Sequence, residues 1–190
     1  PGVAGDASGV SAEIELRFTE VDDDHVGVVL ADSTGAAGDR RMLLVLFSNR
    51  HTAATEDDLL AVLDVRVDPG TPTAALGQWL RDFCHRGRTE PPLPRIAGIR
   101  VDRVASWHGS RQTFRHEVPY RMSVTVRHES EADDGSASAL SLVVTRDDET
   151  LASIDATRLP RLRPGRIGMV ALSQSAEFRL VRAGGLAPAP

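Results

Sequence analysis

Six histidines and one cysteine are the side chains of this sequence best suited to bind a metal ion or to act as nucleophile or base. Zinc sites need clustered ligands, such as Cys-x-x-Cys or His-x-x-x-His, and these residues show no such spacing. Cys84 and His85 are adjacent, but neighbours on a helix point about 100° apart, and Cys84 belongs to an apolar stripe that favours a buried thiol. The sequence therefore predicts no metal site, no cofactor and no identifiable catalytic residue.

Four residues form the best candidate for a small-molecule pocket. Trp107 and His108 lie near a turn between two expected strands, from which they could reach His116 or Tyr120 if the sheet curls. An enclosed pocket there would suit acid–base chemistry on an apolar substrate. The competing interpretation is that His116, on the apolar face of its strand, is a packed neutral side chain bonded to a backbone carbonyl.

Three arginines form the candidate partner-binding surface. Arg115, Arg121 and Arg127 share the outward phase of a strand expected at 112–128. Outward arginines can dock an acidic protein partner, or they can form cross-strand ion pairs with residues such as Glu117. Both interpretations remain open at this point.

The charge distribution makes the docking interpretation attractive. The chain has 190 residues and a net charge of −5, with 16 acids and 8 arginines in residues 1–94 but 11 acids and 14 arginines in residues 95–190. An acidic chain of pI about 5.7 does not coat nucleic acid. No apolar run approaches the roughly 18 residues of a membrane helix, so we expect no membrane insertion and a soluble, cytoplasmic protein. The sequence leaves the oligomeric state open.

Alternating apolar and polar residues indicate strands that position these groups. A period of two places alternate side chains on one buried face, whereas Leu76, Trp79, Leu80 and Phe83 recur at helical spacing. We therefore expect an α+β fold: a mostly antiparallel β-sheet of about eight or nine strands with one amphipathic helix packed on it. The expected strands are 12–19, 26–30, 41–47, 59–68, 96–107, 112–128, 139–145, 151–156 and 167–181, and the expected helix is 74–85.

The domain organisation follows from where these patterns begin and end. We expect a flexible N-terminal segment at 1–11, a single α+β domain at 12–182 and a linker-like tail rich in Pro and Gly at 183–190. Linker-like ends are typical of a module that has neighbours.

The order of these elements is similar to that of a known family. A strand ending in Asp68-Pro69-Gly70-Thr71, the helix, and the strands at 111–128 and 138–156 together resemble PsbP/MOG1-like domains. The resemblance covers about half of the chain and lies in element order, so no functional residue is carried over. It implies a binding or assembly module without catalysis.

We therefore expect a non-catalytic protein-interaction or assembly module, an accessory domain of a larger system with a protein partner. The alternative is a small-molecule enzyme whose pocket lies in a curved β-sheet.

Overall fold

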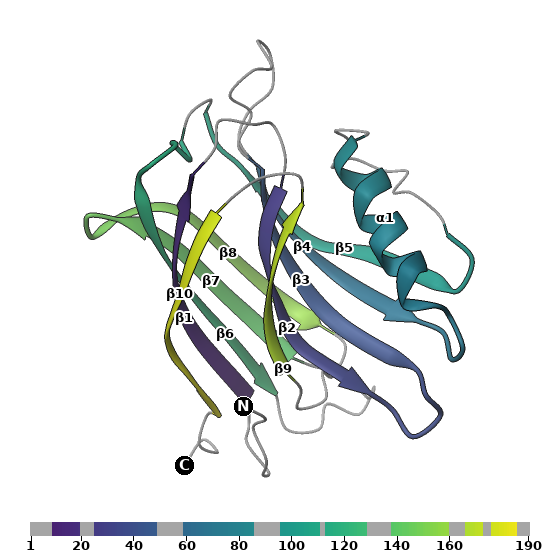
Figure 1. Cartoon of the computed structure of the whole chain (residues 1–190). Coiled ribbons are helices and arrows are strands. Elements are labelled where there is room, and N and C mark those ends of the chain that lie inside the picture. Colours follow the sequence, from purple (N-terminus) through teal and green to yellow (C-terminus); the bar gives the residue numbers. More distant parts are fainter. Residues whose placement is uncertain are drawn as a thin grey trace.

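The computed structural model describes residues 9–19, 25–48, 59–85, 96–110, 113–128, 138–159, 166–172 and 176–185. These residues form ten strands and one helix, with the strands in two five-stranded sheets (Figure 1). The elements are β1 (Gly9–Phe18), β2 (His25–Thr34), β3 (Arg40–Ser48), β4 (Leu59–Val67), α1 (Thr73–His85), β5 (Ile99–His108), β6 (Pro119–His128), β7 (Ser138–Arg146), β8 (Glu149–Leu159), β9 (Arg166–Leu172) and β10 (Ala176–Gly185).

The two sheets are antiparallel throughout. Sheet A has the strand order β10-β1-β6-β7-β8, and sheet B has the order β5-β4-β3-β2-β9. β10 and β9 are therefore edge strands, as are β8 and β5. Helix α1 is not long and apolar enough to cross a membrane.

The two sheets enclose the main core. Alternation on β1 buries Ile14, Leu16 and Phe18, and these pack with inward side chains of sheet B such as Val45 and Phe47. The predicted antiparallel sheet and single helix are confirmed, but the expectation of one sheet is wrong. A period-two pattern reveals a buried face without revealing what covers it, and here each sheet covers the other.

Helix α1 covers the outer face of sheet B (Figure 1). Trp79 is fully buried among apolar side chains of β3 and β4, including Leu44 and Leu63, while Leu76 and Leu80 are partly buried against the same cluster. The side chains of Phe83 and Cys84 lie outside the described residues. The central strands β3 and β4 are thus covered on both faces, because one face meets sheet A and the other meets the helix.

The last expected strand, 167–181, is in fact two strands in different sheets. β9 pairs with β2 of sheet B, whereas β10 pairs with β1 of sheet A. The chain changes sheets between them, and similar apolar alternation on both sides conceals the change. Residues 9–11 and 183–185 belong to β1 and β10, and the rest of the expected terminal segments lies outside the described residues.

The strand expected at 112–128 is shorter in the structure than the alternating residues predict. β6 begins only at Pro119, and Glu117 before it has a φ of 59°, a left-handed conformation that interrupts an extended chain. Proline lacks the amide that an interior strand position must donate, so the first position of a strand suits it.

Gly27 of β2 is required by close packing between β2 and β3. A Cβ atom at this buried position would lie 2.2 Å from the carbonyl oxygen of Val45. We therefore expect Gly27→Ala to lower the free energy of unfolding by about 1–3 kcal/mol, measured by urea denaturation. Gly168→Ala on the neighbouring strand β9 is the matched control, because its nearest atom, Val29 Cβ, would be 3.8 Å away. Equal losses in both variants would contradict this account.

Candidate functional site

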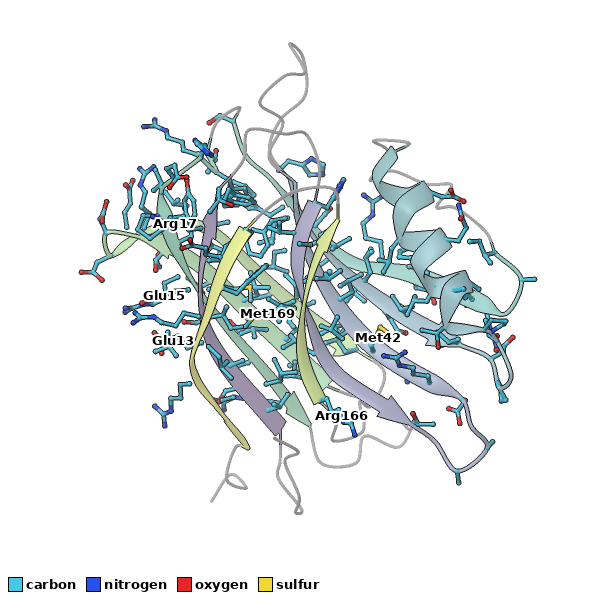
Figure 2. The ribbon with its side chains drawn as sticks, viewed as in Figure 1. Glu13, Glu15, Arg17, Met42, Arg166 and Met169 are labelled. Carbon is cyan, nitrogen blue, oxygen red and sulfur yellow. The ribbon has the colours of Figure 1, made fainter. Side chains whose placement is uncertain are left out.

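The outer face of sheet A is the most distinctive polar surface among the described residues. No described element covers it, since α1 packs on sheet B. Strand alternation turns Glu13, Glu15 and Arg17 of β1 away from the core, and Figure 2 shows all three projecting on the side of sheet A opposite to sheet B. We call this surface the charged face, and its charged residues are Glu13, Glu15, Arg17, Arg121, Arg127, Asp155, Glu177, Arg179 and Arg182.

Cross-strand ion pairs organise the centre of the charged face. Arg121 of β6 lies between two carboxylates, with Nε 3.3 Å from Glu13 Oε1 and Nη2 3.3 Å from Glu15 Oε1. Arg179 of β10 reaches Glu15 from the other side, with Nε 2.8 Å from Oε2. The hydrogen bond from Arg179, with that from Arg121, lowers the pKa of Glu15 despite its partial burial. The carboxylate is therefore held ionised between two guanidinium groups.

A second ion pair lies beside the first group. Arg17 Nη2 donates to Glu177 Oε2 at 2.6 Å, joining β1 to β10. Arg17 also lies 3.4 Å from Glu117. Since residues directly opposite in an antiparallel sheet are neighbours, opposite charges on adjacent strands hold these long side chains in defined positions.

The charged face nevertheless carries more positive than negative charge. Its described residues include five arginines, three glutamates and Asp155, although the chain as a whole is acidic. Arg127 lies opposite Gly9 and Ala139, and Arg182 lies opposite Glu13, which is paired with Arg121. No ion pair joins Arg127 or Arg182 to a described residue. These two guanidinium groups are available to an incoming anion.

The three predicted partner-binding arginines are not equivalent in the structure. Arg121 and Arg127 lie on the charged face, near the beginning and near the end of β6. Arg115 precedes β6, in the segment before Glu117, and its backbone amide donates a hydrogen bond to the Tyr120 hydroxyl. The structure thus brings two of them onto one surface and leaves Arg115 in a connecting segment. Arg179 and Arg182, which complete the surface, were missed because they follow Arg121 by more than fifty residues.

The four predicted pocket residues do not line one cavity, and two of them, Trp107 and Tyr120, belong to an aromatic cluster. Phe114 is fully buried, with its ring 5.8 Å from that of Trp107 and 5.7 Å from that of Tyr120. Trp107 and Tyr120 therefore face a filled space, while His108 is exposed. Burial raises the pKa of Tyr120, opposed by the Arg115 amide and by the nearby Arg146 guanidinium.

His116 is bonded to a backbone carbonyl, as one of its two interpretations predicts. Its Nε2 lies 2.9 Å from the Thr19 carbonyl oxygen and 3.5 Å from Glu117 Oε1. The side chain is 34% exposed, so it is not the packed core residue that this interpretation also predicted.

One described cavity of about 310 Å³ lies where β6 begins and β7 turns into β8. Tyr120 is the only one of the four predicted pocket residues that lines it. Its other walls combine two arginines with three carboxylates, a threonine and a proline: Arg121, Arg146, Glu15, Asp147, Asp148, Thr145 and Pro119. No group of three His, Cys, Asp or Glu side chains that could hold a metal ion occurs among the described residues.

Asp64 is a charged residue that the sequence pattern assigns to the surface although it is buried. Alternation on β4 predicts that Asp64 points outward, yet the residue is only 1% exposed, because it faces sheet A on the same side as Leu60 and Val62. Arg41 of β3 binds it through two nitrogens at 2.9 and 2.8 Å, and Arg66 binds it at 3.0 and 2.8 Å. This buried group is part of the scaffold.

Comparisons with known proteins find structural similarity without a sequence match. No family model matches this sequence, and no curated protein sequence matches it. The solved structure of sheep galectin-11 in complex with glycerol is similar over 98% of this chain and 98% of its own, at 10% identity and with a TM-score of 0.44. At these values the likeness carries no conclusion about the activity or ligands of this chain.

Proposed function

We propose that this protein is a non-catalytic protein-interaction module that binds an acidic segment of a partner protein on the charged face of sheet A. One observation carries the proposal: an uncovered sheet face holds five arginines against four carboxylates in a chain whose net charge is −5. Complementary charge on a partner raises its association rate and selects against basic competitors.

The part of the charged face between Gly9 and Glu13 is best suited to the contact. Arg127 lies opposite Gly9 and Arg182 lies opposite Glu13, both are exposed, and the small polar residues Ser11, Ser123 and Thr125 lie between them on β1 and β6. Short side chains allow an extended segment to lie close to the sheet, so that its carboxylates can reach both guanidinium groups. Arg121, in contrast, is already shared between Glu13 and Glu15.

The position of the ion pairs supports recognition over catalysis. Glu15 and Asp64 are held ionised by arginines, and neither is paired with a described nucleophile or histidine. The resemblance in element order to PsbP/MOG1-like domains implies the same class of function, a binding or assembly module.

The proposal predicts a charge-dependent interaction. Replacing both Arg127 and Arg182 by Ser should weaken binding of a fluorescent polyglutamate peptide about tenfold, because exposed ion pairs contribute roughly 0.2–1 kcal/mol each. Binding of the parent should also weaken as salt rises from about 50 to 300 mM, which shortens the Debye length. Fluorescence anisotropy measures both effects.

The matched control is Arg166→Ser, which removes an exposed arginine from β9 of sheet B and should leave the affinity unchanged. Partners captured from native lysate by the parent should likewise be lost from the double variant and kept by the control. Equal affinity of the double variant and the parent for polyglutamate would refute this binding surface.

A further inference from the structure

The outer edge of β10 combines a free strand edge with exposed apolar side chains. β10 pairs with β1 on one side, and no strand within the described ranges pairs with its other side. The exposed large hydrophobic residues of the described part of the chain are Met169, Leu180 and Val181, each 40–44% exposed. All three lie on β9 or β10, which are the edge strands of the two sheets on the side away from β5 and β8. Free edges with apolar side chains are templates for pairing with another strand.

Two of these side chains point toward the core side of their sheets but lie at the edge, where the opposite sheet does not cover them. Leu180 lies opposite the buried Ile14, and Met169 lies opposite the buried Val28, so both point to the core side of their sheets. β5 and β8 approach one another at the opposite edge, but β9 and β10 leave these side chains uncovered. Figure 2 shows Met169 on β9, beside β10 in this view. A further strand added to β10 would cover Leu180.

The charges across sheet A indicate which strand fits. Arg121, Glu15 and Arg179 lie side by side on β6, β1 and β10, so positive, negative and positive charges alternate up to the free edge. In the adjacent row, Arg17 of β1 lies opposite Glu177 of β10. The edge strand therefore presents Glu177 and Arg179 on its outer face, with Phe178 between them on the core face.

We propose that β10 pairs antiparallel with β10 of a second copy of this chain, with the two-fold axis at Phe178. In this register Arg179 lies opposite Glu177 of the second copy, and Glu177 lies opposite Arg179 of the second copy. The charge alternation of each sheet then continues across the junction without two like charges in contact. Leu180 lies opposite Ala176 of the second copy, which covers part of its exposed surface. Such a contact is isologous and closes at two copies.

Charge excludes the two neighbouring registers. An axis at Glu177 would place two glutamates opposite one another, and an axis at Arg179 would place two arginines opposite one another, both of which are destabilising. An axis between two residues would oppose side chains from different faces of the sheet, which the pleat does not allow. This inference is independent of the acidic partner proposed above, since it concerns the edge of β10 and a second copy of the same chain.

The test uses two variants that repel themselves and complement one another. Glu177→Arg leaves two arginines on each edge, and Arg179→Glu leaves two glutamates, so each variant alone should dimerise at least about tenfold more weakly than the parent. A mixture of the two restores both opposite-charge pairs. Native mass spectrometry distinguishes the mixed dimer by its mass, and sedimentation velocity measures the dissociation constants.

We expect the parent to be dimeric at about 100 µM, each variant to be mainly monomeric, and the equimolar mixture to form mixed dimers with an affinity within about threefold of the parent. Each substitution also creates repulsion within its own chain, between Arg17 and the arginine at position 177 or between Glu15 and the glutamate at position 179. This repulsion is the same in the separate variants and in their mixture, so it does not affect the comparison of their dimer affinities. Arg127→Glu, on the charged face but on β6, is the control that should dimerise like the parent. A monomeric parent, dimeric single variants, or a mixture that stays monomeric while both variants remain folded would each overturn the proposal.

Discussion

Replacing Trp79 with alanine is expected to lower the free energy of unfolding by about 3–5 kcal/mol. The side chain is fully buried between α1 and the outer face of sheet B, where it packs with residues of β3 and β4 such as Leu44 and Val65. Removing the indole leaves a cavity that the two central strands cannot fill, because their other face is packed against sheet A. Urea denaturation followed by circular dichroism measures the loss.

The control for this prediction is Gln78→Ala on the same helix. Gln78 is exposed, and its described contact is a hydrogen bond to Asp82 one turn away, so we expect a change within about 0.5 kcal/mol. If the denaturation curve of the Trp79 variant overlays that of the parent, then α1 does not stabilise the sandwich. Loss of the helix signal at denaturant concentrations where the sheets remain folded would indicate that α1 unfolds separately.

Replacing Asp64 with asparagine is expected to lower the free energy of unfolding at neutral pH by about 2–4 kcal/mol. Removing one partner of a buried ion pair costs roughly 3–5 kcal/mol, and we reduce this value because the Arg66 side chain is 41% exposed and remains partly hydrated. Asp102→Asn is the control, since this exposed carboxylate lies 3.5 Å from Arg66 and should contribute about 0–1 kcal/mol.

The lowered pKa of the Asp64 carboxylate predicts that the stability of the fold depends on pH. Burial by itself raises the pKa of Asp64, but the hydrogen bonds from Arg41 and Arg66 outweigh it and lower the pKa below 3.8 in the folded state. A lowered pKa stabilises the fold above the unfolded-state value, and that stabilisation is lost as the pH falls through the folded-state pKa. Stability of the parent should therefore decline below about pH 4 more steeply than stability of Asp64→Asn. Parallel profiles would show that Asp64 is not ionised in the fold.

Asp64 shows why a local pattern can predict a strand correctly and still assign one of its residues to the solvent when that residue is buried. Leu63, Val65 and Val67 alternate with Asp64 and Arg66, which is the pattern of a strand with one wet face. Both faces of β4 are in fact covered, and the polar residues on the second face are accommodated because Arg41, from the neighbouring strand, neutralises Asp64. That neutralising partner is 23 residues away in the sequence.

The charged face depends even more on distant pairing. Arg121 on β6 could be assigned to an outward phase from its neighbours in the sequence. Its partners Glu13 and Glu15, however, lie on β1, and Arg179 reaches Glu15 from 164 residues away. No local period contains this information. The outward phase of Arg121 and Arg127 was therefore predictable, whereas the pairs that neutralise Arg121 were not.

Local periodicity by itself determined that this chain is built from strands with one helix. A period of two indicates strands, because their side chains point alternately to two sides, whereas the spacing of Leu76, Trp79 and Leu80 indicates the helix. Only the tertiary structure decided that the strands form two sheets and that β9 and β10 separate, since sheet membership depends on hydrogen bonds between residues far apart in the chain. It also decided which arginines share a surface and which strand edge remains free. Those properties arise from the order of strands across a sheet, and that order is set by the packing of the whole core.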